Sequence, residues 1–267
     1  MSFALEWLDL REPADHAARD PSLLDAAAAF LMAAEAPLVV DLGAGSGSTL
    51  RAFGARVAGA RWRLVDRDRA LLGAAAARAG AETVEADLRA VDSLPLAGAR
   101  LVTASALLDL VSAAWVERLA GLLAADVSLY AALSYDGTVI WEPALREDAA
   151  VLAAFNAHQR GDKGFGPALG PDAGRHLARV LEERGFAVAT AASPWQLGPE
   201  QWQLQAALAE GIGAAAVESG VVAGGWVQAR REAAMAGVSS CIVGHLDVLA
   251  LPVGARRQSK TTSVSSP

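Results

Sequence analysis

The sequence predicts an α/β protein in which a mainly parallel sheet carries helices on both faces. Between residues 38 and 133, short runs of β-favouring apolar residues alternate with segments of helical periodicity. A glycine-dense turn follows the first apolar run, and an acidic residue closes each of the first three. Strands that are separated by helices favour parallel pairing, and such sheets bind ligands beyond the carboxyl ends of their strands.

The composition indicates a soluble protein of a reducing compartment. Among 267 residues, 23 Lys and Arg stand against 30 Asp and Glu, and this net charge of -7 argues against nucleic acid as the main partner. No uncharged apolar run reaches transmembrane length, and the N-terminus lacks the basic start of a signal peptide. Cys241 is the single cysteine, which excludes a disulfide framework and a Cys/His metal site. We therefore expect a cytoplasmic protein without a metal or a membrane partner, and the sequence gives no oligomeric state.

Residues 3–35 predict a helical preface to the sheet. Its first helical pattern contains Pro13, which breaks the apolar group. If the helix continues past Pro13, then Arg11, Asp15 and Arg19 share one face and could cover the mouth of a site. The alternative is an ordinary solvated helix face.

The central part predicts five strands in chain order, at residues 38–42, 61–66, 83–86, 100–104 and 127–133. Helices are expected between them near residues 48–58, 68–79 and 112–124. Asp136 and Gly137 predict a turn after the fifth strand, and a short extended piece follows at residues 138–141.

The rest of the chain predicts helices near residues 144–156 and 171–185, a sixth strand at 186–191 and a final strand at 239–250. His245 and Asp247 would share one face of the final strand. The proposed division of the chain is a cap at 1–36, a main domain at 37–253, helices inserted at 199–236 and a disordered tail at 254–267.

The glycine-dense turn, D-L-G-A-G-S-G at residues 41–47, is the most informative motif. A tight loop between a buried strand and a helix N-terminus suits a nucleotide-like cofactor. A dinucleotide fingerprint would need its third glycine at Ser48. Asp41 would repel a pyrophosphate but suits a cationic ligand, such as an α-ammonium group beside a sulfonium. The turn resembles the first motif of the class I S-adenosylmethionine (SAM)-dependent methyltransferases, and the alternative is a glycine-rich turn of another doubly wound protein.

Two further acidic residues strengthen this resemblance. Asp66 closes the second strand, where a carboxylate can accept both hydroxyls of an adenosine ribose. Asp87 and Leu88 match the place where the family holds adenine, although Asp87 could instead be a turn residue. The resemblance implies SAM as the cofactor, bound by Asp41, Gly43, Ala44, Gly45, Gly47, Asp66, Arg67, Asp87, Leu88 and Ser105.

The resemblance also implies a Rossmann-like sheet of about seven strands, in which the last strand is antiparallel and lies between the fifth and sixth. It covers residues 37–135 strongly and omits the preface and the inserted helices. The sequence lacks the D/N-P-P-Y/F signature and the catalytic-cysteine motif of DNA base methyltransferases. These omissions argue against a DNA base methyltransferase. From the resemblance, we expect methyl transfer to an oxygen or nitrogen nucleophile of a small molecule.

Residues 155–167 gather cationic, aromatic and glycine residues in the connection after the fifth strand. Lys163 is one of only two lysines in a chain that otherwise uses arginine. We interpret the segment as a lid or pocket wall, and a polar surface loop is the alternative. The predicted substrate-binding residues are Tyr135, Arg160, Lys163 and Phe165. The predicted general bases are His158, Asp136 and Asp109, of which Asp109 could equally be an ordinary residue in a first helical turn.

Two other functions share the same motifs. An aminopropyl transferase would usually place more paired acids after the fourth strand, and this sequence has few. A non-catalytic partner subunit would not need the glycine turn or the acidic strand ends.

Overall fold

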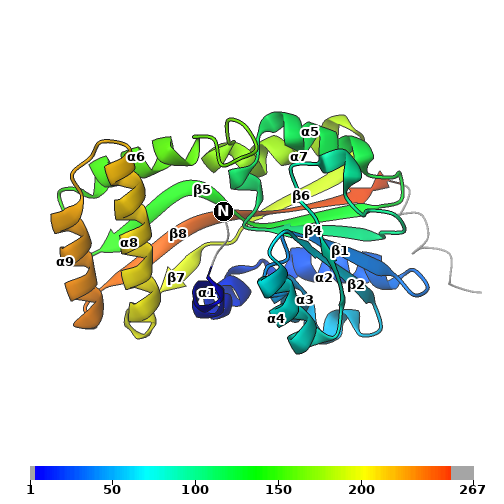
Figure 1. The fold of residues 1–267 in the computed structure, drawn as a ribbon, viewed down its shortest axis with the longest axis horizontal. Helices are drawn as coiled ribbons and strands as arrows, with labels where there is room; N and C mark the ends of the chain where they lie inside the picture. The colour runs from blue at the N-terminus through cyan, green and yellow to red at the C-terminus, as the bar shows by residue number, and fades with distance from the viewer. Residues whose placement is uncertain (1–3, 254–267) are drawn as a thin grey trace, which may run out of the picture.

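The computed structural model describes residues 4–253 and shows one mixed sheet flanked by helices (Figure 1). The strands follow the order β3-β2-β1-β4-β5-β8-β6, and β7 pairs with β8 outside this path. The first five strands pair in parallel, whereas β8 runs antiparallel to β5, β6 and β7. The strands are β1 Leu38–Leu42, β2 Arg61–Asp66, β3 Glu82–Glu85, β4 Leu101–Ser105, β5 Ser128–Glu142, β6 Phe186–Ala192, β7 Trp195–Leu197 and β8 Ser240–Pro252. The tail expected at 254–267 lies outside the described residues.

Helices cover both faces of the parallel part, with α5 and α7 on one side and α2, α3 and α4 on the other (Figure 1). Asp20 caps α2 and Asp68 caps α4, since each carboxylate accepts backbone N–H groups of its helix. The α-helices are α1 Leu5–Ala18, α2 Pro21–Met32, α3 Ser48–Phe53, α4 Arg69–Ala79, α5 Ala113–Leu122, α6 Asp148–Gln159, α7 Ala173–Glu183, α8 Trp202–Glu218 and α9 Gly224–Met235.

The apolar strand runs are buried because helices pack against both faces of the sheet. On one face of the sheet, Trp115 of α5 and Leu177 of α7 belong to one core cluster together with buried strand residues. On the opposite face, the ring of Phe53 meets Trp62 and Tyr130 edge-on, with centroids 5.7 and 5.8 Å apart. The predicted alternation of strands and helices over residues 38–133 is therefore confirmed.

The turn predicted at Asp136 and Gly137 is wrong. β5 continues through both residues to Glu142 and stays paired with β8. The pairing register shifts twice along the way, close to Leu133 and Gly137, whose φ angles are +56° and +96°. Bulges therefore accommodate the Asp-Gly sequence, because a long neighbouring strand continues to supply backbone partners.

The extended ends of β5 and β8 carry the inserted helices α8 and α9 (Figure 1). Arg230 of α9 is 1% exposed, and its Nη1 donates to the carbonyl of Pro143 at 2.7 Å. The Arg230 guanidinium also pairs with Asp148 of α6 and lies 5.0 Å from the centre of the Trp141 ring. These contacts fix the insertion to the sheet. The division into cap, domain and insertion stays a prediction.

Helix α1 continues through Pro13 and lies against β7. Asp15 accepts two hydrogen bonds from the Arg11 guanidinium, at 2.8 and 3.0 Å, and a third from Trp195 Nε1 at 3.0 Å. Arg11 also lies over the Trp195 ring, 5.1 Å from its centre. α1 is thereby held between the parallel sheet and the insertion (Figure 1).

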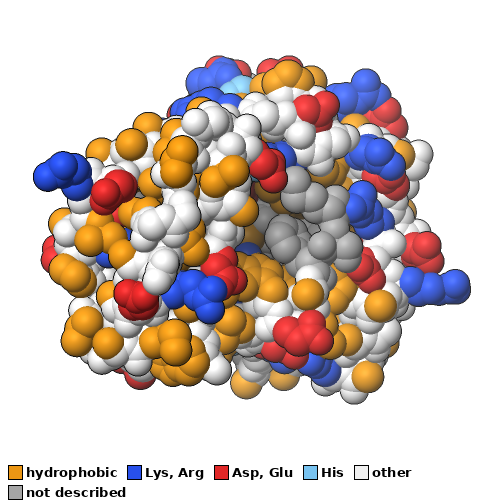
Figure 2. Space-filling model, turned by 60° about the vertical axis from the view of Figure 1, so that its left-hand side comes forward, with side chains coloured by type: hydrophobic (Ala, Val, Ile, Leu, Met, Phe, Trp, Pro, Cys, Tyr) orange, Lys and Arg blue, Asp and Glu red, His pale blue; other side chains and the backbone are white. Residues whose placement is uncertain are grey.

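Residues 4–253 were compared with what a membrane, a metal ion or a nucleic acid would require as a partner. No helix in this range is long and apolar enough to cross a bilayer, and no group of His, Cys, Asp or Glu side chains in it is arranged to hold a metal ion. Figure 2 shows acidic and basic side chains interspersed over one face of the molecule. That face offers no extended basic patch of the kind that binds a nucleic-acid backbone.

Candidate functional site

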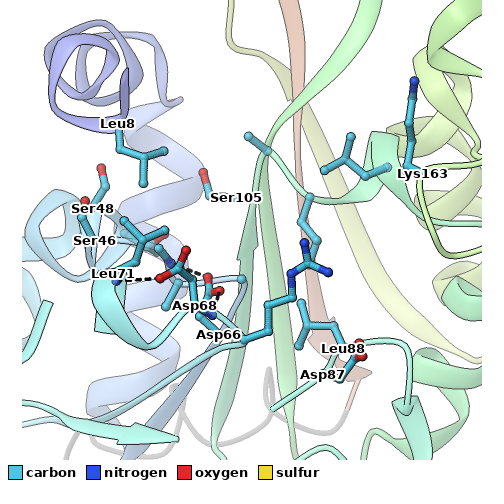
Figure 3. Close-up of a pocket in the computed structure, with 18 of the residues that line it drawn as sticks. Leu8, Ser46, Ser48, Asp66, Asp68, Leu71, Asp87, Leu88, Ser105 and Lys163 are labelled. Carbon is cyan, nitrogen blue, oxygen red and sulfur yellow. Dashed lines mark hydrogen bonds between the residues drawn. The ribbon is translucent and has the colours of Figure 1, made fainter. Parts of the chain in front are cut away.

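A cleft lies at the carboxyl ends of the parallel strands, the edge at which such sheets bind ligands (Figure 3). Its lining comes from the glycine loop after β1, the segments that follow β2, β3 and β4, helix α1 and the loop 163–165. Figure 3 shows Leu8 of α1 and Lys163 on opposite sides of the cleft. The residues predicted from sequence that line it are Gly43, Ala44, Gly45, Asp66, Arg67, Asp87, Leu88, Ser105, Lys163 and Phe165.

The glycine loop needs its glycines for backbone conformation. Gly43, Gly45 and Gly47 have φ angles of +68°, +51° and +84°, which L-residues with a side chain rarely adopt. A Cβ atom on Gly45 would also lie 3.2 Å from Leu8 Cδ1, so α1 packs closely over the loop. Gly47 lies outside the described lining of the cleft and supports the loop through its conformation.

Asp66 connects the end of β2 to the glycine loop. Its Oδ2 accepts the N–H of Gly45 at 2.9 Å, and its Oδ1 accepts the N–H of Asp68 at 2.9 Å. A carboxylate has about four lone-pair positions, so each oxygen retains capacity for a further donor. The side chain is therefore held in place and can still accept two hydroxyl groups of a ligand.

Asp41 lies beneath the loop and does not belong to the described cleft lining. It is 1% exposed, its Oδ1 accepts the Thr103 hydroxyl at 2.7 Å, and its Oδ2 has no hydrogen-bond partner among residues 4–253. Burial raises the pKa of Asp41 to about 7, although the Thr103 hydrogen bond and the charge of Arg19 oppose the rise. A cation brought close to it would favour the ionised form.

Asp87 and Leu88 follow β3 and face the cleft. The carboxylate of Asp87 is paired with Arg89, whose Nε lies 2.9 and 2.8 Å from its two oxygens. Hydrogen bonds from Arg89 lower the pKa of Asp87 to about 2. The carbonyl of Leu88 accepts Trp115 Nε1 at 2.7 Å, which fixes this segment against α5.

Ser105 ends β4 in the cleft and accepts a hydrogen bond from Arg19 Nη2 at 2.9 Å. Arg19 is 4% exposed, and its Nε and Nη1 have no hydrogen-bond partner among the described residues. A buried guanidinium with two unpartnered nitrogens is costly unless something else satisfies it. Two incompletely paired side chains, the cation of Arg19 and the acid of Asp41, are therefore buried behind the cleft lining.

The predicted substrate-binding residues separate into two pairs. Lys163 and Phe165 line the cleft, and the Phe165 ring packs edge-on against Trp115. Tyr135 lies outside the described lining, and its hydroxyl donates to Asn156 Oδ1 at 2.8 Å. Arg160 is turned to the surface, where it pairs with Asp172 at 3.0 Å.

None of the three predicted general bases belongs to the described cleft lining. His158 lies behind Lys163, and Asp136 accepts the N–H of Thr138 at 2.9 Å beside β8. Asp109 lies in a short turn after β4, and its buried Oδ1 has no partner within residues 4–253. Burial raises the pKa of Asp109 to about 6, against the opposing charges of Arg11 and Lys163.

Comparison with known proteins gives matches among solved structures alone, since no family model and no curated protein matches the sequence. The YcgJ protein of Bacillus subtilis is 14% identical with a TM-score of 0.50, and the match covers 87% of this chain and 99% of that one. Two SAM-dependent methyltransferases, each in complex with S-adenosylhomocysteine, come from Geobacter sulfurreducens and Thiobacillus denitrificans. They are 15% and 16% identical with TM-scores of 0.49 and 0.48, and both matches cover 94% of this chain and all of the other.

The strand order decides which kind of α/β fold this is. β8 runs antiparallel between β5 and β6 at the end of an otherwise parallel sheet, as the sequence resemblance implied. The chain has the class I methyltransferase fold. In this methyltransferase fold, the glycine loop, Asp66 and Asp87 occupy the successive strand ends at which the sequence predicted a cofactor.

The main residues that sequence reasoning left unassigned come from α1, outside the part of the methyltransferase fold that the motifs cover. Leu8, Arg11 and Asp15 line the cleft, and Arg19 contacts its wall through Ser105. The shared helix face of Arg11, Asp15 and Arg19 was the available signal. This spacing did not identify the three residues as site residues, because a solvent-exposed helix face shows the same pattern.

Proposed function

We propose that this protein transfers a methyl group from SAM to an oxygen or nitrogen nucleophile of a small molecule. The observation that carries the proposal is the hydrogen bond between Asp66 and Gly45, which joins a ribose-type acceptor to a glycine loop inside one cleft. A location in the cytoplasm is part of the same proposal.

Residues of the cleft lining, together with two buried residues behind it, fit the parts of this cofactor. Asp66 would accept the ribose hydroxyls, and Asp87 with Leu88 would lie along the adenine. Arg19 and Asp41, which are buried and incompletely paired, would satisfy the α-carboxylate and the α-ammonium group respectively. The pairings of Arg19 and Asp41 would each give a buried polar atom a partner that it lacks among the described residues.

The protein's own task is to align the acceptor and to exclude water. Bound SAM supplies an electrophilic methyl group on a sulfonium. Leu8 of α1 and Phe165 contribute apolar surface to the cleft wall, beside the charged groups of Arg11 and Lys163. Holding two reactants in line in such a space can supply much of the rate enhancement.

Calorimetric titration with SAM and with S-adenosylhomocysteine tests the proposal directly. We expect one site per chain for each ligand, and a rise in melting temperature on binding. A Gly45→Val variant, which places a branched side chain at a φ of +51° against Leu8, should lose binding. Absence of heat and of stabilisation in the unmodified protein would refute the proposal. A screen of small-molecule acceptors for S-adenosylhomocysteine release then identifies the acceptor.

The affinity for SAM is expected to rise by about tenfold between pH 6 and pH 7.5, because Asp41 has a pKa of about 7. Below that pKa the carboxyl group is protonated and neutral, so binding of the α-ammonium group must first release a proton. Above it the carboxylate attracts the cation without this cost.

Calorimetry across this pH range in the unmodified protein and in Asp41→Asn measures the effect. The Asn variant should bind more weakly at pH 7.5 and lose the pH dependence, whereas Asp92→Asn, on the surface beside Arg118, should retain it. A dependence that persists in Asp41→Asn would assign it to another group.

A further inference from the structure

We propose that Lys163 is the general base on the acceptor side of the cleft, and that His158 and Glu218 position its amine. This inference rests on the proposed function. It also assigns a positioning role to the inserted helix α8, in which Glu218 is the last residue.

Three side chains from three segments form a continuous series that begins at the cleft. Lys163 lines the cleft, and its Nζ lies 3.0 Å from His158 Nδ1 in α6. His158 Nε2 lies 2.9 Å from Glu218 Oε2 in α8. Glu218 is 70% exposed, so the series ends at the surface.

The order of these contacts fixes the role of each nitrogen. The Glu218 carboxylate is an acceptor, so His158 Nε2 carries a hydrogen in this contact. The lone pair on Nδ1 then accepts a hydrogen from Lys163, which holds the amine by one of its hydrogens. Both ring nitrogens of His158 are therefore engaged, whereas Lys163 belongs to the cleft lining. For this reason we assign the base role to Lys163 and a positioning role to His158.

The loop that carries Lys163 is ordered by its own hydrogen bonds. Asp162 Oδ1 accepts the N–H groups of Gly164 and Gly166, at 2.6 and 3.0 Å. The backbone of Asp162 also forms an isolated antiparallel β-bridge with Pro167. The Lys163 side chain thus projects from a closed turn. Figure 3 shows it across the cleft from Leu8.

The charges that face Lys163 come from several neighbouring elements. Burial lowers the pKa of Lys163, while the charges of Glu218 on α8 and of Asp109 after β4 oppose that decrease. His158 on α6 contributes a hydrogen-bond acceptor. Desolvation favours the neutral amine that a general base requires, whereas the acceptor on His158 fixes the position of that amine.

The proton step balances within this series. The O–H or N–H bond of the acceptor breaks, a new N–H bond forms with the lone pair of Lys163 Nζ, and the electron pair stays on the acceptor atom as the nucleophile. When the product leaves, the Lys163 ammonium returns this proton to water that enters the cleft, and His158 and Glu218 keep their hydrogen bonds throughout.

The titration of Lys163 tests this assignment without an identified acceptor. Acetic anhydride, which reacts with neutral amines alone, is applied in trace amounts across a pH series, and acetylation is quantified at each site by peptide mass spectrometry. A short lysine peptide in the same tube supplies the reference. Lys163 and Lys260 are the only lysines of the chain, so the two sites are readily separated.

We expect Lys163 to react with a midpoint at lower pH than the reference lysine. Glu218→Gln should move that midpoint lower still, because it removes a negative charge that favours the ammonium form. The matched control is Glu210→Gln, also on α8 but paired with Arg231 of α9, which should leave the midpoint unchanged.

Two results would overturn the proposal. One is an acetylation midpoint of Lys163 at the same pH as that of the reference lysine, and the other is the same Lys163 midpoint in the Glu218→Gln and Glu210→Gln variants. Calorimetry with SAM on the same proteins separates this failure from failure of the proposed function. We expect all three proteins to bind SAM with equal affinity, and loss of binding in the unmodified protein would refute the proposed function whatever the titration shows.

Discussion

Replacing Asp247 with alanine is expected to lower the free energy of unfolding by about 3–5 kcal/mol. The carboxylate is fully buried in β8 and accepts four hydrogen bonds. Its donors are the Tyr130 hydroxyl at 2.9 Å, the Ser193 hydroxyl at 2.6 Å, and the backbone N–H groups of Leu133 and Asp20 at 2.9 and 3.1 Å. Alanine would leave these donors buried without an acceptor.

Urea denaturation followed by circular dichroism measures this effect. Asp25→Ala is the control, since its exposed ion pair with Arg56 should change stability by no more than about 0.5 kcal/mol. A loss below about 1 kcal/mol in Asp247→Ala would mean that the four donors find other partners. The Asp20 bond joins the α1–α2 connection to the sheet, so the variant should also weaken the packing of α1.

Asp66→Ala should weaken SAM binding by about 1–3 kcal/mol, or roughly fivefold to 150-fold. The variant removes the acceptor for the ribose hydroxyls and also releases the N–H of Gly45, which shapes the loop. Asp66→Asn retains one acceptor oxygen, so its affinity for SAM should lie between those of the unmodified protein and of Asp66→Ala.

Calorimetric titration with SAM at pH 7.5 provides the measurement. Asp92→Ala serves as the control, because Asp92 pairs with Arg118 outside the cleft lining. Unchanged affinity in Asp66→Ala would remove Asp66 from the cofactor site, while the fold assignment would stand.

The cofactor side of the site was predictable because its residues follow strand ends that local patterns identify. Gly43, Gly45 and Asp66 each belong to a short segment in which periodicity and glycine placement are sufficient. The structure brings these segments to one cleft, as parallel pairing requires.

The acceptor side was less predictable because its residues meet through long-range packing. Asp136 and Gly137 form a turn signal in isolation, yet β5 continues through them because the residues on either side, Tyr135 and Val139, pair with β8. Tyr135 is buried in β5 and Arg160 follows α6, and Asn156 and Asp172 engage their side chains outside the cleft lining. Local sequence cannot reveal such partners, since they depend on how α6 and β8 pack.

The bond between Asp15 and Trp195 joins two positions 180 residues apart. It makes one wall of the cleft dependent on β7, a three-residue strand that pairs with the outer part of β8. A chain shortened from β7 through α9 would retain every motif for the cofactor and would lose one anchor of α1, which would still be held by the ion pairs of Glu12 with Arg51 and of Asp9 with Arg78. The helix that contributes Leu8 and Arg11 to the cleft wall is thus linked, through the indole of Trp195, to the part of the sheet that carries the inserted helices.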